Sequence, residues 1–145
     1  MKIPAPKPAQ VIRYSYLWAD EHDDGREEGR KDRPAAIVMT LQPEGGDLQV
    51  VVVPITHSAP QDNADAMELA PAVKRQLGLD DERSWAVLTE INVFVWPGPD
   101  LRPTGEGDEG TILYGYLPAN VFRNIRDRLA ANIKAGKARR VRRTI

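Results

Sequence analysis

Two apolar, β-branched segments joined by a short turn dominate the first half of the chain. The segments are Ala35 to Leu41 (AAIVMTL) and Leu48 to Thr56 (LQVVVVPIT), and the sequence EGGD at residues 44 to 47 lies between them. A glycine-containing turn between two such runs predicts a β-hairpin. The uninterrupted valines of the second segment indicate a strand that is buried on both faces. Pro34 belongs at the start of the first strand, because proline cannot donate a ladder hydrogen bond.

The remaining sequence predicts further strands around this hairpin. These strands are expected in segments rich in β-branched and aromatic residues, namely Val11 to Trp18, Met67 to Leu69, Trp85 to Trp96 and Ile112 to Leu117. The segment from Trp85 is long enough to be one bent strand or two strands joined at a bulge. A short helix is expected over Pro71 to Leu77. Two polar segments rich in charge, glycine or proline, Ala19 to Asp32 and Pro97 to Gly110, predict loops.

A single amphipathic helix follows the last predicted strand. Its apolar residues recur at steps of three and four and form one stripe: Val121, Phe122, Ile125, Leu129 and Ile133. Pro118 favours the start of this helix and Gly136 its end. A chain of strands with one helix in last place predicts a mainly β fold, in which an antiparallel, barrel-like sheet has the helix packed across one opening.

The length of 145 residues favours one domain. We expect an irregular lead-in over residues 1–10, a single domain over residues 11–136 and a basic tail over residues 137–145. The chain has no cysteine, which excludes disulfides and thiol chemistry and fits a reducing compartment. The first ten residues lack the apolar run of a secretory signal, and no later segment is long and apolar enough to span a membrane. We therefore expect a cytoplasmic protein without a membrane partner.

The net charge of −1 conceals an uneven distribution of charge. Acidic residues crowd the predicted loop after Trp18, whereas no acid follows Asp127 and six basic residues lie between Lys134 and Arg143. Two interpretations of the basic segment remain open. It contacts a phosphate backbone, or it is a solvated, frayed terminus that keeps the protein soluble.

The sequence argues against several kinds of chemical site. The two histidines, His22 and His57, lie in no metal-binding motif, so we expect neither a metal nor another cofactor. The segment Gly105 to Gly110 (GEGDEG) has the glycines of a phosphate loop, but it carries three acids and lacks the lysine. A Gly-x-Ser-x-Gly nucleophile motif is also missing from the sequence.

The predicted hairpin itself suggests a phosphodiester site. The start of its first strand and the end of its second lie side by side, so Arg33 and Thr56 are expected at one edge of the sheet. Glu28 and His57 lie close to them in sequence. Arg33 suits the stabilisation of a phosphorane, since its planar guanidinium binds phosphate oxygens in pairs and stays charged. Thr56 would orient an oxygen, and Glu28 or His57 would transfer protons.

These segments resemble the PemK/MazF family of toxins. The stretch GREEGRKDRPAAIVM (residues 25 to 39) resembles the family's first signature, and VVVVPITHS (residues 50 to 58) its second. WAVLTEINVFVW resembles the long bent strand, and LPANVFRNIRDRLAANI the C-terminal helix. The resemblance implies an SH3-like antiparallel barrel, a homodimer, and a metal-independent endoribonuclease that cuts single-stranded RNA such as mRNA at a short sequence and is inhibited by an antitoxin protein.

Carried over by position, the resemblance assigns the catalytic roles to Arg33, Thr56 and, five places before the arginine, Glu28. His57 joins them as a candidate. Arg30, Lys31 and Ser58 flank these residues and are expected to contact substrate. Trp18 borders the charged loop and could stack on a base. The glycine-aspartate pair that normally opens the family's first strand is missing, and Pro8-Ala9-Gln10 stands there instead.

The residues alone leave simpler interpretations open. Arg33 could pair with Glu27 or Glu28 at the surface, and Thr56 and His57 could be ordinary strand and loop residues. At the level of function, the alternatives to a nuclease are a non-catalytic SH3-like module that binds RNA or a peptide, and a degenerate toxin that keeps only its antitoxin interface.

Overall fold

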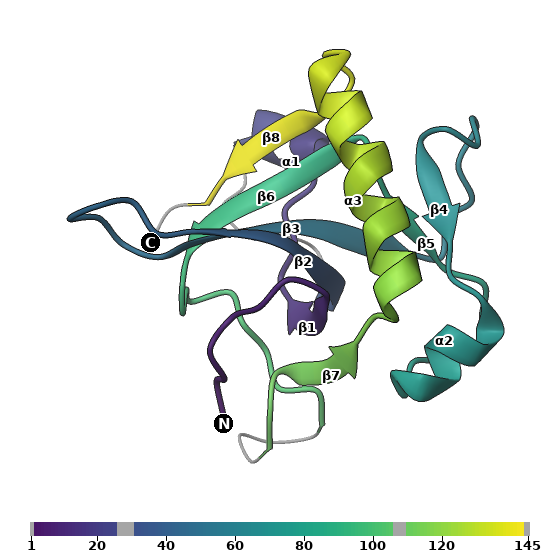
Figure 1. Ribbon diagram of the computed structural model, residues 1–145, viewed down its shortest axis with the longest axis horizontal. Helices are drawn as coiled ribbons and strands as arrows, with labels where there is room; N and C mark the ends of the chain where they lie inside the picture. Colours follow the sequence, from purple (N-terminus) through teal and green to yellow (C-terminus); the bar gives the residue numbers. More distant parts are fainter. Residues whose placement is uncertain (1, 26–30, 106–109, 144–145) are drawn as a thin grey trace.

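The computed structural model describes residues 2–25, 31–105 and 110–143, which form a mainly antiparallel β-sheet with a C-terminal helix (Figure 1). The eight strands in these ranges are β1 (Gln10–Tyr14), β2 (Arg33–Leu41), β3 (Gln49–Thr56), β4 (Ala66–Glu68), β5 (Trp85–Val87), β6 (Glu90–Val95), β7 (Leu113–Tyr116) and β8 (Arg139–Arg142). The helices are α1 (Ala19–Asp23), α2 (Pro71–Gln76) and α3 (Ala119–Lys134). The mainly β character of the fold and its C-terminal helix are thus as predicted.

Strand β3 is the centre of the sheet. It pairs with β2 along one edge, and its other edge is shared between β6 at one end and β5 at the other. The segment from Trp85 therefore forms two strands, because β5 and β6 pair with different parts of β3. The hydrogen-bonded order runs β4-β5-β3-β2-β1-β7, and β6 also pairs in parallel with β8. Among the described residues the ends of this order do not pair with each other, so the sheet is not closed into a barrel.

The valines of β3 pack into two apolar cores, one on each face. Val51 and Val53 belong to a cluster that also contains Ile125 and Leu129 of α3, which lies across this face of the sheet (Figure 1). Val50 and Val52 point the other way, into a cluster with Tyr14 and its neighbours. Burial on both faces, which the valine run predicts, is confirmed.

One predicted core position of α3 is wrong. Ile133 is 50% exposed, whereas its neighbour Asn132 is buried. The amide of Asn132 donates a hydrogen bond to the main-chain oxygen of Leu88 at 2.8 Å. The last turn of α3 therefore faces a carbonyl that needs a donor, and an amide serves there better than an alkyl group. No helix in residues 2–25, 31–105 and 110–143 is long and apolar enough to cross a membrane.

The first charged loop is also more ordered than its composition predicts. Residues Ala19–Asp23 form α1. A carboxylate oxygen of Glu21 accepts a hydrogen bond from the main-chain N–H of Trp18 at 3.2 Å, and Glu90 accepts one from Ala19 at 3.0 Å. Carboxylates at the start of a helix satisfy its unpaired N–H groups and interact favourably with its dipole. Glu21 of this segment and Glu90 of β6 thus stabilise a short helix where composition predicts a loop.

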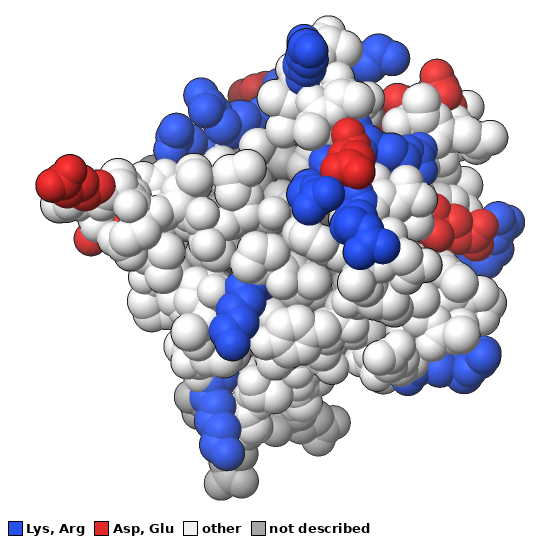
Figure 2. Space-filling model, in the orientation of Figure 1, with Lys and Arg blue, Asp and Glu red and all other residues white. Residues whose placement is uncertain are grey.

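The basic C-terminal segment contains a strand. Arg139–Arg142 form β8 beside β6, with Val141 buried and the three arginines exposed. Arg143 follows with an almost fully buried side chain. Figure 2 shows lysine and arginine side chains beside β8 and along α3 on the face that α3 covers. A frayed terminus therefore does not describe residues 139–143.

Candidate active site

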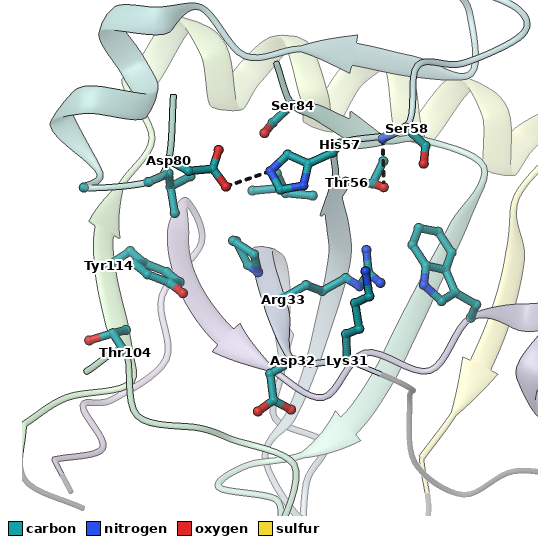
Figure 3. A pocket seen from close by; sticks show the side chains of 15 residues that line it. Lys31, Asp32, Arg33, Thr56, His57, Ser58, Asp80, Ser84, Thr104 and Tyr114 are labelled. Carbon is teal, nitrogen blue, oxygen red and sulfur yellow. Dashed lines mark hydrogen bonds and ion pairs between the residues drawn. The ribbon is translucent and has the colours of Figure 1, made fainter. Parts of the chain in front are cut away.

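The hairpin register places Arg33 opposite Thr56. Ala35 pairs with Pro54 in the β2–β3 ladder, and the same antiparallel register continued by two positions brings Arg33 level with Thr56. β2 begins at Arg33 and β3 ends at Thr56. Both side chains line one cavity of about 610 Å³ (Figure 3). The structure thus brings together the two residues on which the sequence hypothesis depends.

Six of the eight residues predicted for the site line this cavity. They are Trp18, Lys31, Arg33, Thr56, His57 and Ser58. The other two, Glu28 and Arg30, lie outside the described residues, as does Glu27. The wall is completed by residues that the sequence did not single out, among them Asp80, Ser84, Thr104 and Tyr114.

The guanidinium of Arg33 has no hydrogen bond or ion pair within the described part of the chain. Its Cζ lies 4.9 Å from the centre of the Trp18 ring, and its Nε is buried without a hydrogen-bond partner there. Burial lowers the pKa of the guanidinium and the charge of Glu21 opposes this effect, but an arginine remains protonated at neutral pH. The guanidinium belongs to a residue that lines the cavity, so those of its N–H groups that reach the cavity can donate to an anion there.

The other charges of the cavity favour an anion as well. Asp32 lies 4.0 Å from Arg13 and 3.6 Å from Arg102, and Asp80 lies 2.6 Å from the ammonium of Lys74. Both acids that line the cavity are therefore largely neutralised by cations. Arg33 and Lys31 form no ion pair with a described residue, and the charges of Glu21 and Glu90 act on Arg33 from outside the cavity lining. Among the described lining residues, these two cations are therefore not paired with an acid of the cavity wall.

Thr56 keeps hydrogen-bonding capacity at the cavity wall. It is half-buried, and its Oγ1 accepts a hydrogen bond from the main-chain N–H of Ser58 at 3.2 Å. This local bond fixes the hydroxyl oxygen at the point where β3 ends. The hydroxyl hydrogen is still available to donate to a phosphate oxygen.

His57 is bound to a carboxylate rather than free in a loop. Its Nε2 lies 2.7 Å from Oδ2 of Asp80, and Oδ1 of the same carboxylate lies 2.6 Å from Nζ of Lys74. The hydrogen bond from Lys74 lowers the pKa of the Asp80 carboxyl, and His57 adds to this effect against the opposing influence of burial. The cavity therefore contains an imidazole that is oriented by an ionised carboxylate, an arrangement suited to proton transfer.

The same residues form a group of possible metal ligands that the sequence did not reveal. One ligand atom each of His57, Asp80 and Glu82 lie within 4.8 Å of one another, and all three residues are exposed. Imidazole and carboxylate ligands suit zinc and similar ions. However, the ammonium of Lys74 on Asp80 repels a cation at this place, and Lys74 is almost fully buried.

Trp18 lies beside Arg33 as a half-buried ring. The guanidinium covers one face of the indole, and the ring meets Tyr16 edge to face with centres 5.2 Å apart. One face is thus already used for a cation–π contact, which holds the guanidinium in place. Tyr114 contributes a second aromatic side chain to the opposite wall (Figure 3), and burial raises the pKa of its hydroxyl.

Sequence reasoning missed Asp80 and Lys74 because they lie in a turn and a short helix without a recognisable motif. The signal that could have located them is strand pairing, since Thr56 pairs with Trp85 in the β3–β5 ladder. The turn before Trp85 must therefore lie next to His57. Comparison of the chain with known protein-family models and with curated proteins gives no match.

Proposed function

We propose that this protein is a metal-independent endoribonuclease that cleaves single-stranded RNA in the Arg33–Thr56 cavity. The observation that carries the proposal is the guanidinium of Arg33, which is half-buried, forms no ion pair with a described acid, and lines the same cavity as Thr56 and His57. A structural arginine would normally be paired, whereas an arginine that binds phosphate must keep its donors available.

The proposed reaction is an attack of the RNA on itself. The ribose 2′-oxygen forms a bond to the adjacent phosphorus while the bond from phosphorus to the 5′-oxygen breaks. His57 takes the proton of the 2′-hydroxyl, and water gives a proton to the 5′-oxygen. The products are a 2′,3′-cyclic phosphate and a 5′-hydroxyl. The atoms and electrons of this step balance without an oxidant or a metal.

Arg33 and Thr56 would stabilise the crowded phosphorane. The guanidinium would bind the two oxygens on which negative charge increases, and the hydroxyl of Thr56 would donate to one of them. Donors fixed in place before the reaction provide the largest single contribution in many enzymes, and loss of one costs on the order of 100- to 1,000-fold in rate. Only RNA carries the attacking hydroxyl, so DNA would bind without being cut.

The wider biological assignment rests on the motif resemblance. We propose that the chain is a toxin of the PemK/MazF type, that it acts in the cytoplasm as a homodimer, and that an antitoxin protein inhibits it. We also propose that the sheet is an opened variant of the SH3-like barrel, because β3 divides one edge between β5 and β6 and this division bends the sheet. The basic residues beside β8 would then support RNA binding in a salt-dependent way.

The experiment uses purified protein, a long unstructured RNA and buffer that contains EDTA. The wild type should produce fragments, and Arg33→Ala should reduce the initial rate at least 100-fold. Arg83→Ala is a matched control, because Arg83 also lies 4.9 Å from a tryptophan ring, that of Trp85, but pairs with Glu68 away from the cavity. This control should cut RNA like the wild type. RNA that stays intact but is retained at low salt would instead identify a binding module without catalysis.

A further inference from the structure

Lys74 has an unusual position for a lysine. Its side chain is 4% exposed on the short helix α2. An ammonium group removed from water is strongly disfavoured unless hydrogen bonds and an opposite charge compensate for the lost hydration. Nζ meets this requirement by donating to Oδ1 of Asp80 at 2.6 Å and to the main-chain oxygen of Glu82. The fold therefore fixes a buried positive charge directly behind Asp80.

Asp80 uses its two oxygens in opposite directions. Oδ1 accepts hydrogen bonds from Lys74 and from the main-chain N–H of Glu82, the latter at 3.2 Å. Oδ2 lies on the other side, 2.7 Å from Nε2 of His57. The bonds to Oδ1 prevent the carboxylate from rotating, so Oδ2 is held towards the imidazole (Figure 3).

This arrangement determines which nitrogen of His57 carries the hydrogen. An ionised carboxylate can only accept hydrogen bonds, so the nitrogen beside it, Nε2, must be the donor. In the neutral ring the lone pair is then on Nδ1, and this second nitrogen lies on the side of the cavity where Arg33 is found (Figure 3). The ring thus presents its basic atom to the place where the substrate phosphate would bind.

We propose that Lys74 and Asp80 are positioning residues that hold His57 as the Nε2–H tautomer, so that Nδ1 takes the proton of the ribose 2′-hydroxyl. This inference rests on the proposed function, because it specifies the atom that performs the proton transfer. We call the contacts from Nζ of Lys74 to Asp80 and from Asp80 to His57 the relay. The relay connects a buried positive charge in α2 with the side of the cavity where the reaction is proposed. Lys74 and Asp80 themselves do not touch the RNA.

Two other ionisable groups face the relay. Oε2 of Glu82 lies 3.7 Å from Nε2 of His57, with a side chain that is 69% exposed. Tyr114 on β7 interacts electrostatically with Asp80. The carboxylate of Glu82 lies farther from the imidazole than that of Asp80 does. Lys74 binds the main-chain oxygen of Glu82 and not its carboxylate. Glu82→Gln is therefore the matched control for loss of a carboxylate near His57.

The first test measures the tautomer without any RNA. Long-range ¹H–¹⁵N spectra of the wild type at neutral to mildly alkaline pH should give His57 the ¹⁵N shifts of a single Nε2–H form. His22, the other histidine of the chain, is exposed and provides an internal reference for an unconstrained ring. In the double variant Lys74→Met/Asp80→Ala, which leaves no unpaired ammonium behind, the His57 shifts should move to those of His22. An Nδ1–H form, or wild-type shifts equal to those of His22, would overturn the inference.

The second test measures cleavage. Lys74→Met/Asp80→Ala should lower kcat on the order of 100-fold with KM unchanged, because the effect is on proton transfer and not on phosphate binding. Formate should restore part of kcat in Asp80→Ala, since it can replace the lost carboxylate beside Lys74. Glu82→Gln should retain the wild-type kcat. A double variant in which KM rises while kcat stays the same, or one that cleaves like the wild type, would contradict the positioning role.

If the wild type does not cleave RNA at all, the nuclease proposal fails, whereas the nitrogen shifts of His57 still decide whether the relay exists.

Discussion

The buried ion pair at the end of the chain allows a quantitative prediction about stability. Arg143 and Asp100 have side chains that are 2% and 7% exposed, and Nη2 lies 2.9 Å from Oδ1. Nη1 of Arg143 also donates to the main-chain oxygen of Ser15 and to the hydroxyl of Tyr14. Arg143 thus connects the end of β8 to the loop after β6 and to the segment around the end of β1.

Arg143→Met should destabilise the fold strongly, because it removes the buried guanidinium that pairs with the carboxylate of Asp100. Breaking one side of a buried, hydrogen-bonded ion pair costs about 3–5 kcal/mol. A domain of this size loses roughly 2–4 °C in Tm for each kcal/mol, so we expect a decrease of about 6–20 °C. Thermal unfolding followed by circular dichroism, together with urea titration, measures both quantities.

Arg142→Met is the control for this prediction. Arg142, the last residue of β8, is exposed, and among the described residues its side chain donates a single hydrogen bond, to Gln49 at 3.3 Å. Its replacement should change the free energy of unfolding by less than about 0.5 kcal/mol. If Arg143→Met melts within 2–3 °C of Arg142→Met, a shift worth roughly 1 kcal/mol, the C-terminal residues do not fasten the sheet and the reasoning is refuted.

Three further predictions concern single groups. Thr56→Val should lower kcat on the order of 100-fold with little change in Tm, because the Ser58 N–H that loses its acceptor is exposed to water; steady-state cleavage rates that match the wild type would contradict this role. Burial raises the pKa of the Glu90 carboxyl above its usual 4.5, so the folded state binds this proton more tightly and stability falls as the pH rises above 4.5. The free energy of unfolding of Glu90→Gln, measured by urea titration from pH 4 to 7, should lack this decrease. Identical pH dependence in the wild type and the variant would refute the role of Glu90. Asn132→Leu should cost about 1–3 kcal/mol in urea titration, because the carbonyl of Leu88 loses its donor, and an unaffected midpoint would count against that bond.

The hairpin and the closing helix could be predicted because local patterns determine them. The valine run of β3 is too apolar for a strand exposed on either face, and the glycine turn before it leaves little choice of partner. The stripe of Ile125 and Leu129 likewise identifies the buried face of α3. These signals depend on neighbours in sequence, and the structure contains them as expected.

Elements that depend on distant partners could not be predicted. β8 is a run of arginines around a single valine, and it is a strand because β6 offers a free edge and Asp100 offers a buried counter-charge to Arg143. α1 is highly charged, yet Glu90 from another strand satisfies one N–H group at its start. Composition alone favours a tail in place of β8 and a loop in place of α1.

The candidate site was predictable in part for the same reason. Arg33 and Thr56 follow from the register of one hairpin, so their proximity could be deduced. The partners of His57 come from α2 and the turn before β5, which reach it only through the pairing of β5 with β3. Glu28 remains a prediction, since it lies outside the described residues.

The most direct test of the central claim is the chemistry of the cut ends. A DNA oligonucleotide carries one ribonucleotide at a position where the protein cuts an RNA of the same sequence. It is incubated with the protein in EDTA, and the products are identified by mass spectrometry. We predict cleavage only at the ribonucleotide, with a 2′,3′-cyclic phosphate on one fragment and a 5′-hydroxyl on the other, and loss of both products in Arg33→Ala. An uncut oligonucleotide, or fragments that carry a 5′-phosphate and a 3′-hydroxyl, would contradict attack by the ribose in the Arg33–Thr56 cavity.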